Sequence, residues 1–356
     1  CRYDTNALKS LDVFSVHGFP VGLVQCESNL LGIPNGQHGS MVGSGGWSNI
    51  IEKYARAKAY CDAPFEVKHE GKRKSIIPIQ GEWIGEKRNG EGPGQRRARI
   101  VSGDSAQADL ARASLDAVFT DPPYFGNVQY AELMDFCYVW LRKLVGAGNS
   151  SFSRESTRDP DELTGNVNMG RGLEHFAQGL SLVFSRFAEA LKPGSPFAFT
   201  FHHNQLEAYL PVAMAILDAK LTCSGSMPCP AEMGASIHIS GTGSSVMDTV
   251  FVCRTTGRVP RRWIVDGPEG VARIVRDDLA SLSEANIRIT QGDVRCIVHG
   301  HIVRLCIWRL RQDWDAARPA AEKLAVVREW MAAELPHDNV LALLGNTEAS
   351  PKRWGP

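Results

Sequence analysis

Residues 115–144 read LDAVFTDPPYFGNVQYAELMDFCYVWLRKL, and this stretch decides the fold. Its apolar run at 117–120 has the length and composition of a buried strand, which ends at two prolines because proline lacks an N–H donor. After Tyr130, apolar residues recur at three- and four-residue spacing, as on one face of a helix. They are Leu133, Phe136, Cys137, Trp140, Leu141 and Leu144. The stretch therefore predicts a strand, a stiff loop and a helix, and an open α/β sheet binds its ligands at the carboxyl ends of its strands.

The loop after this strand, Asp121-Pro122-Pro123-Tyr124, resembles the catalytic motif of the amino-methyltransferases, which transfer a methyl group from S-adenosyl-L-methionine (SAM) to an exocyclic base amine. The lone pair of such an amine is delocalised into the ring, so the nitrogen is a poor nucleophile. The Asp121 carboxylate and a main-chain carbonyl such as that of Pro122 can accept both amine hydrogens and aim the lone pair at the methyl group. Positioning of this kind can lower the barrier by roughly 7–11 kcal/mol. A simple turn between strand and helix is the alternative interpretation.

The target base has to leave the duplex before it reacts, and aromatic residues of the motif offer surfaces on which to stack it. The ring of Tyr124, together with Phe125, is the expected platform, and such stacking is worth about 1–3 kcal/mol. Because stacking needs the ring and not the hydroxyl, we expect Tyr124→Phe to be tolerated. The resemblance to the amino-methyltransferases implies that aspartate at the first motif position favours adenine, whereas asparagine would admit glutamine methylation in proteins and serine would favour cytosine.

Three stretches widen the resemblance: Ser102-Gly103-Asp104, residues 114–133 and Glu162-Leu163-Thr164-Gly165-Asn166. Together they resemble the prokaryotic adenine-specific DNA methylases that contain a zinc ribbon, over about residues 11–254 of this chain. The resemblance implies a Rossmann-like SAM-dependent methyltransferase sheet, incomplete at its N-terminal side, that methylates the N6 amine of a flipped adenine in DNA in the cytoplasm. The family's glycine loop for SAM lies upstream of the matched region. Since the chain also begins with cysteine, we expect a fragment that lacks the N-terminal half of the same protein.

Two places in the chain are candidates for contact with SAM. Residues 99–104 predict a strand ending in an acid, and in the resembling family this acid, Asp104 after Gly103, faces the adenine end of SAM. A helix N-cap at Asp104, for a helix over Ser105 to Leu110, is the other interpretation and is compatible with the first. The second candidate is the run Gly43-Ser44-Gly45-Gly46, with Gly43 and Gly45 as the possible contacts. A SAM-binding glycine loop follows a buried strand and precedes a helix, and the next strand ends in an acid. Of these three features, the sequence around Gly43 predicts only the helix. We therefore expect this chain alone to bind SAM weakly or not at all.

A second strand brings further polar side chains to the same edge. A helix is predicted at 176–191 and a buried strand at 197–201, so the strands at 117–120 and 197–201 are expected to be parallel. His202 and His203 then lie beside the motif, where they contact the base, a phosphate or the cofactor, or simply cap the strand end. The candidate contacts to the base or DNA are Phe125, Asn127, Tyr130, His202 and His203.

Composition divides the chain into three parts. Residues 1–97 combine two short strands at 11–31, a glycine-rich loop, a helix at about 48–61 and a basic linker at 85–97 that we expect to be mobile. Residues 98–256 form the catalytic core, which ends in a strand pair at 221–227 and 246–254. Residues 257–356 predict helices at about 268–284, 294–310 and 316–335, interpreted as a helical accessory domain. The polar segment 146–168 is a lid, a DNA-contacting segment or a disordered connector.

The totals suit a protein with a hydrophobic core, since 43% of the 356 residues are hydrophobic. The sequence has no apolar run of about eighteen residues and no signal peptide, so we expect no membrane partner. Nine cysteines without a Cys-x-x-Cys pair indicate reduced thiols and no metal site. The net charge of zero is low for a DNA-binding protein, but residues 68–99 are rich in lysine and arginine, and this stretch either follows phosphates or is a solvated loop.

The leading prediction is methylation of adenine N6 in DNA with SAM as cofactor. The first alternative is a non-catalytic nucleic-acid-binding module that keeps the base pocket. The second is an RNA base methyltransferase, because a flipped base presents the same edges in either polymer. SAM binding separates the catalytic prediction from the non-catalytic one.

Overall fold

The computed structural model describes residues 2–4, 9–11, 33–34, 41–42, 47–70, 73–79, 98–126, 129–146, 148–231, 245, 247–256, 259, 263–287 and 289–345. The chain forms two compact units, Cys1–Ser102 and Gly103–Pro356, and each is described by itself. The boundary expected after residue 97 lies close to the division between these units.

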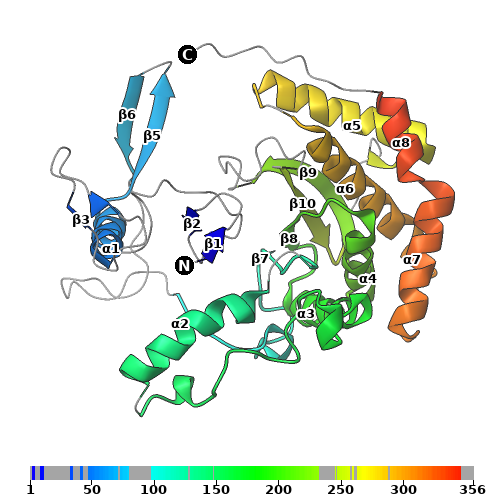
Figure 1. Cartoon of the computed structure of the whole chain (residues 1–356). Coiled ribbons are helices and arrows are strands. Elements are labelled where there is room, and N and C mark those ends of the chain that lie inside the picture. The colour runs from blue at the N-terminus through cyan, green and yellow to red at the C-terminus, as the bar shows by residue number, and fades with distance from the viewer. Residues whose placement is uncertain are drawn as a thin grey trace. The chain divides into compact units, whose positions relative to one another are not determined.

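The described elements of the first unit are short hairpins and one helix (Figure 1). They are β1 (Arg2–Asp4), β2 (Lys9–Leu11), β3 (Ile33–Pro34), β4 (Met41–Val42), α1 (Trp47–Asp62), β5 (Phe65–Glu70) and β6 (Arg73–Pro78). The strands pair antiparallel as β1 with β2, β3 with β4 and β5 with β6. Helix α1 confirms the helix predicted at 48–61. Apart from Leu11, the segment 11–31 lies outside the described residues, as do Gly43, Gly45 and the linker expected at 85–97.

The second unit is built on a four-stranded sheet with parallel and antiparallel pairs. Its strands are β7 (Val118–Thr120), β8 (Pro196–Phe201), β9 (Thr222–Pro230) and β10 (Met247–Arg254), in the spatial order β7-β8-β10-β9. β7 and β8 are parallel, with Val118 opposite Phe197, and β10 is antiparallel to both of its neighbours. The chain passes from β7 to β8 through helices α2 (Tyr130–Val145) and α3 (Leu173–Ala190), as a parallel pair requires. The four predicted strands and the parallel pairing are therefore confirmed.

No strand forms at residues 99–104, where the sequence predicted one. Ile100 is 96% exposed and Val101 also lies at the surface. Within the described ranges, β8 is the one strand that pairs with β7, and no strand accepts hydrogen bonds from residues 99–104. An apolar run needs a neighbouring strand to satisfy its backbone groups, so this prediction is wrong for the structure described.

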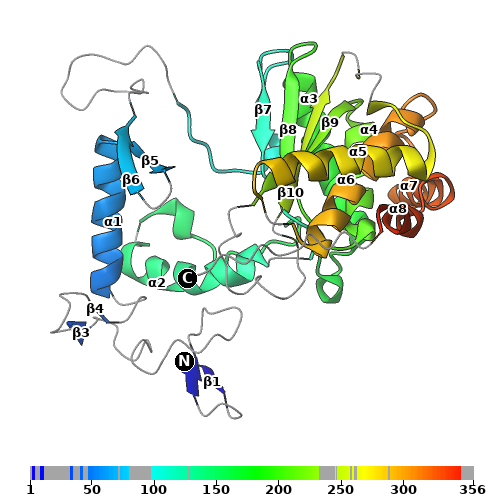
Figure 2. The ribbon, with the colours of Figure 1, turned by 90° about the horizontal axis from the view of Figure 1, so that it is seen from above.

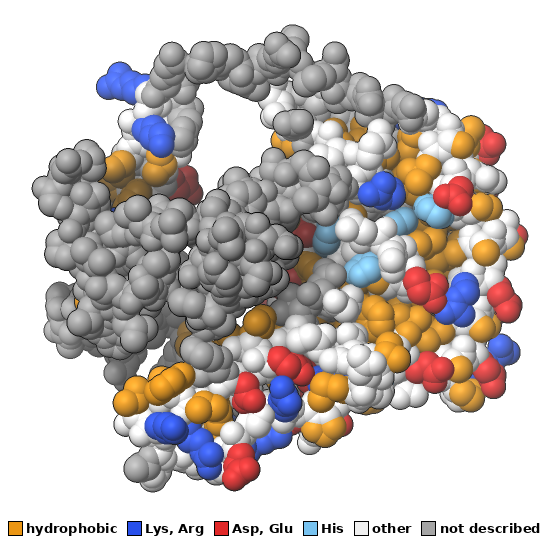
Figure 3. Space-filling model, viewed as in Figure 1, with side chains coloured by type: hydrophobic (Ala, Val, Ile, Leu, Met, Phe, Trp, Pro, Cys, Tyr) orange, Lys and Arg blue, Asp and Glu red, His pale blue; other side chains and the backbone are white. Residues whose placement is uncertain are grey.

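Helix α2 forms where it was predicted, but its apolar face is exposed (Figure 3). The exposed apolar side chains on α2 are Tyr130, Leu133, Met134, Val139, Trp140, Leu141, Leu144 and Val145. The polar side of the helix contacts the segment that follows it. Asp135 accepts a hydrogen bond of 2.7 Å from the Thr157 N–H, and the Tyr138 hydroxyl donates to the Arg154 carbonyl at 2.8 Å. Polar contacts therefore hold α2 in place on this side, and the segment 146–168 is packed against it.

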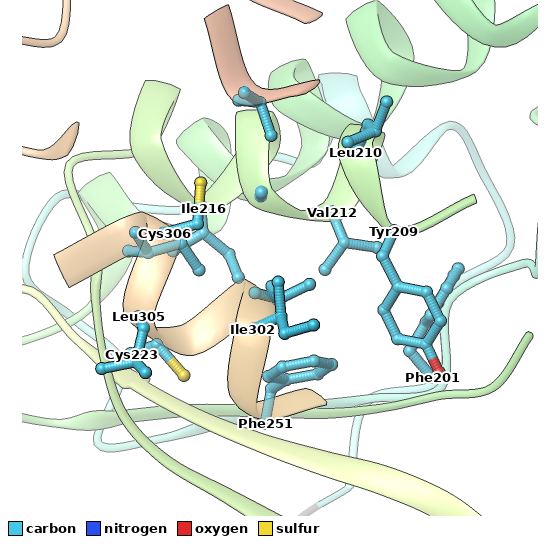
Figure 4. Packing of buried hydrophobic residues seen from close by; sticks show 14 of the residues in the cluster. Phe201, Tyr209, Leu210, Val212, Ile216, Cys223, Phe251, Ile302, Leu305 and Cys306 are labelled. Carbon is cyan, nitrogen blue, oxygen red and sulfur yellow. The ribbon is translucent and has the colours of Figure 1, made fainter. Parts of the chain in front are cut away.

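The hydrophobic core of the second unit lies where helices α4 (Leu210–Asp218) and α6 (Gln291–Leu310) meet the sheet. Figure 4 shows Val212 of α4 and Ile302 of α6 pointing toward Phe251 of β10. Gly300 lets α6 approach the strands closely, because a Cβ atom there would lie 2.6 Å from Ser226 Oγ and 2.7 Å from Thr249 Cγ2. This core supports the strand ends at which the candidate site lies.

The C-terminal helices lie on the side of the sheet away from β7 (Figures 1 and 2). Besides α6 they are α5 (Gly267–Glu284), α7 (Ala320–Glu334) and α8 (His337–Leu344). The three predicted helices are confirmed, and α8 is additional. The separate accessory domain is not observed, because these helices belong to the same compact unit and the same core as the sheet. The physical reason is α6, which is buried along most of its length and so needs neighbours on all sides. Across the described helices, none combines the length and the apolar composition of a membrane span.

Candidate functional site

The predicted motif and the predicted histidines meet at one edge of the sheet. Asp121 follows β7 directly and His202 follows β8 directly, and these strands are parallel and adjacent. Their carboxyl ends therefore lie side by side, as the sequence predicted. In an open α/β sheet this is the edge at which ligands bind.

Two hydroxyl groups hold the Asp121 carboxylate. The Tyr124 hydroxyl donates to Asp121 Oδ1 at 2.9 Å, and the Thr200 hydroxyl donates to the same oxygen. Tyr124 and Thr200 also lie within hydrogen-bonding distance of each other, at 3.2 Å. The side chain of Asp121 is exposed, and Oδ2 makes no hydrogen bond to any residue that the structure describes. One carboxylate oxygen is thus fixed by the protein, and the other is open to a ligand.

Thr200 is a site residue that the sequence reasoning missed. It lies in β8, whose sequence is Pro-Phe-Ala-Phe-Thr-Phe, and it is the one residue of this strand with a polar side chain. A single hydroxyl in a strand of aromatic residues and alanine could have served as the signal. Its partner Asp121 lies 79 positions earlier in the sequence, so the contact itself depends on the pairing of β7 with β8.

Tyr124 combines a packed ring with a hydroxyl that is in use. Its ring contacts Phe201 edge-on, with 5.2 Å between centroids and 61° between planes. Burial raises the pKa of Tyr124, the hydrogen bond with Thr200 lowers it, and the charges of Asp248 and Asp121 raise it again, so the net pKa lies above its ordinary value. The phenol therefore remains protonated and donates to Asp121. The stacking role predicted for the ring gave no function to this hydroxyl, and the structure gives it one.

The other predicted base contacts differ in position. The ring of Phe125 packs edge-on against the buried Phe176 of α3, with 5.4 Å between centroids, so it has a packing role. Tyr130, the first residue of α2, is 45% exposed. Burial and then the charges of Asp121 and Glu162 raise the pKa of Tyr130. Asn127 lies outside the described residues.

The two histidines have local partners. His203 Nδ1 accepts the Gln205 N–H at 3.0 Å, which is the capping role named as the alternative, and burial lowers the pKa of His203. His202 Nδ1 lies 3.0 Å from the Met247 carbonyl and 3.5 Å from Cys296 Sγ. Burial lowers the pKa of His202, but Cys296, the Met247 carbonyl and Asp248 outweigh it, so the net pKa is raised. His202 is therefore fixed beside the site.

Asp104 caps a short helical turn. Its Oδ1 accepts the Ala106 N–H and its Oδ2 accepts the Gln107 side-chain amide, both at 2.8 Å, at the start of the 3-10 helix η2 (Ser105–Gln107). The N-cap role is thus confirmed, although the helix it caps is a 3-10 turn of three residues and not a helix over 105–110. Beside it, Gly103 is exposed, with open space where a Cβ atom would lie. Asp104 and Gly103 are the predicted SAM contacts that fall within the described residues.

Comparisons with protein-family models, with curated proteins and with solved structures found no match. Within the part of the chain that the structure describes, no group of three or more His, Cys, Asp or Glu side chains is placed to hold a metal ion. The candidate site therefore consists of Asp121, Thr200, Tyr124 and their neighbours.

Proposed function

We propose that the second unit contains the catalytic half of a SAM-dependent methyltransferase that acts on the N6 amine of a flipped adenine in DNA. The sheet order supports this proposal. β10 is antiparallel and lies between β8 and β9, which resembles the reversed strand that closes the sheet of SAM-dependent methyltransferases. A Rossmann-like sheet of this kind places its reacting groups at the carboxyl ends of the parallel strands, where Asp121 lies.

The single observation that carries the proposal is the asymmetric bonding of Asp121. Oδ1 is held by the Tyr124 and Thr200 hydroxyls, while Oδ2 of this exposed residue has no hydrogen-bond partner among the described residues. Oδ2 can accept one hydrogen of the adenine amine, and the Pro122 carbonyl can accept the other. Both bonds draw the amine nitrogen toward a tetrahedral geometry and aim its lone pair.

SAM, when bound, supplies the methyl group from its sulfonium. For the bond that it gains to this methyl group, the amine nitrogen would give up one proton. The exposed Asp121 carboxylate can take this proton and release it to water. Tyr130, exposed at the start of α2, provides an aromatic face for the extruded base, together with Tyr124.

The direct test is methyl transfer from radiolabelled SAM at millimolar concentration to an adenine-containing duplex. We expect label in N6-methyladenine, and we expect Asp121→Ala to lower the rate at least about 100-fold, or about 2.7 kcal/mol. The matched control is Asp116→Ala, which removes an exposed carboxylate paired with Lys192 and should retain the rate.

Two results would redirect the assignment. Binding of duplex without any transfer would favour the non-catalytic nucleic-acid-binding module. Transfer to RNA and not to DNA would favour the RNA base methyltransferase. If Asp121→Ala retained the rate, the role given to this carboxylate would be wrong.

A further inference from the structure

A buried arginine lies in the segment between α2 and α3. Arg171 is 1% exposed. Its Nη1 donates to Glu162 Oε2 at 2.6 Å and to Thr164 Oγ1 at 3.1 Å, and its Nη2 lies 3.7 Å from Glu132 Oε1 of α2. A buried charge requires partners of this kind, and the planar guanidinium can serve several at once. Arg171 therefore joins its own segment to the start of α2.

Glu162 carries this link to the backbone of α2. Its Oε1 accepts the Ala131 N–H at 3.0 Å, while Oε2 is held by Arg171. The first N–H groups of a helix have no partner within the helix. The N-cap residue of α2, Gln129, provides no side-chain cap, so Glu162 satisfies the Ala131 group from 31 positions further along the chain.

Gly165 lies directly on the loop that carries Asp121. A Cβ atom at Gly165 would lie 2.7 Å from the Gly126 nitrogen and 2.9 Å from Gly126 Cα, which no side chain can tolerate without a shift. The Gly165 carbonyl also accepts the Gln129 side-chain amide at 3.0 Å. Contact this close requires glycine at position 165, and it places the backbone of residues 162–166 against the end of the motif loop.

Two backbone hydrogen bonds between Arg171 and Asn166, of 2.9 Å and 2.8 Å, close the segment on itself. Leu163 anchors it to α3, where a Cβ atom at Gly179 would lie 2.1 Å from Leu163 Cδ2. The segment is therefore attached to α3 on one side and to the motif loop and α2 on the other.

We propose that residues 162–171 form a positioning clamp for the loop that carries Asp121. Arg171 holds Glu162, Glu162 holds the first turn of α2, and Gly165 sets the path of the backbone at Gly126. The loop is then fixed on the β8 side by Thr200 and on the α2 side by the clamp. None of the clamp residues touches the reacting atoms, so their effect on the reaction, which rests on the proposed function, passes through Asp121.

The clamp can be tested without turnover. Hydrogen exchange of peptides that cover residues 129–136 measures the protection of the Ala131 N–H. Recognition of the amine is measured by comparing the dissociation constants for a duplex with an unpaired adenine and a duplex with an unpaired purine. We expect Glu162→Gln and Gly165→Ala each to raise exchange in these peptides at least about tenfold while β8 and α3 stay protected. We expect the same variants to reduce the preference for adenine over purine at least about fivefold.

Arg154→Met is the matched control. It removes an arginine of the same segment whose ion pair with Asp159 is exposed, and it should change neither measurement. Arg171→Met leaves the carboxylates of Glu132 and Glu162 without their cation. The test therefore does not depend on the folding of that variant and uses Glu162→Gln and Gly165→Ala.

The outcomes separate the clamp from the proposed function. Unchanged exchange in both folded variants would overturn the clamp. An adenine preference that survives a loosened loop would also overturn its role and would leave the function standing. Raised exchange in a protein with no adenine preference at all would support the clamp and count against the methyltransferase proposal.

Discussion

Helices α2 and α4 are both apolar, yet the fold uses them in opposite ways. Every residue of α4 from Leu210 to Leu217 is buried between its neighbours and the sheet. On α2 the apolar face is exposed, and Leu144 is 76% exposed. The strands beside them differ in the same way, because Phe251 of β10 is fully buried whereas Phe119 of β7 is 76% exposed. The second unit therefore has a closed scaffold at β8, β9 and β10 and an open side at β7 and α2.

The candidate site lies where the open side meets the scaffold. Asp121, Tyr124 and Tyr130 belong to the open side, while Thr200 and His202 come from the scaffold. The reacting carboxylate is thus carried by the less enclosed part and held in place by the more enclosed part. An exposed apolar face as large as that of α2 is typical of a surface that contacts another molecule or segment.

The largest expected effect contrasts two phenylalanines of one sheet. Phe251→Ala should lower the free energy of unfolding by about 3–5 kcal/mol, because it leaves a cavity in the core. Phe119→Ala removes a phenyl ring from the open side and should change the free energy of unfolding by less than about 0.5 kcal/mol. Chemical denaturation of the two variants measures both values. Equal losses would mean that Phe119 is covered in solution and would remove the contrast between the two sides.

A titration should sharpen the description of the scaffold. Burial, and then the neighbouring His337, lowers the pKa of His299 to about 3, from an ordinary value of about 6.5. The unfolded chain therefore binds a proton at this site as the pH falls below 6.5, while the folded chain does not. The contribution of His299 to the free energy of unfolding is therefore complete above pH 6.5. It is lost between about pH 6.5 and 3, by at most about 1.4 kcal/mol per pH unit.

His299→Phe keeps an aromatic ring beside Tyr209, which lies 5.3 Å away between centroids, and removes the titrating group. We expect the variant to lose less stability than the unmodified protein as the pH falls from 7 to 4.5, measured by denaturation at each pH. Parallel pH profiles for the two proteins would contradict the assignment of a neutral, buried His299.

The next effect concerns the link between the two sides. Thr200→Val removes one hydroxyl donor from Asp121 with little change of shape, and a hydrogen bond to a charged group contributes about 1.5–3 kcal/mol. We expect methyl transfer to fall roughly 10- to 100-fold, with a smaller loss for Tyr124→Phe, which leaves Thr200 in place. Thr222→Val, in β9 at the opposite edge of the sheet, is the control. If Tyr124→Phe had no effect, the ring alone would matter, as the sequence first suggested.

The sequence predicted the scaffold well because apolar runs and helical spacing are local properties. The runs at β8 and β10 and the spacing along α2 identify those elements without any knowledge of their neighbours. The prediction of a strand at 99–104 was wrong because a strand needs a neighbouring strand, and a local sequence pattern does not show whether one is present. The prediction of a separate accessory domain was wrong for a similar reason, because the burial of α6 depends on its contacts with β9, β10 and α5.

The same limit applies to the site. Asp121 and Tyr124 were found because a four-residue motif carries them, and His202 because it ends a predicted strand. Thr200 and Arg171 act through contacts with residues 79 and 9 positions away, and neither residue lies within a motif of its own. Recognition of these two residues needed the pairing of β7 with β8 and the path of the segment between α2 and α3.

Under the proposed function, Oδ2 of Asp121 accepts a hydrogen of the amine of an extruded adenine. The most direct measurement is the dissociation constant of the protein for a duplex with an unpaired adenine, compared with the same duplex carrying purine, which lacks only the amine. We predict that adenine binds at least about tenfold more tightly, or about 1.4 kcal/mol. The difference should vanish in Asp121→Ala and persist in Asp116→Ala. Equal binding of the two duplexes by the unmodified protein would contradict the account.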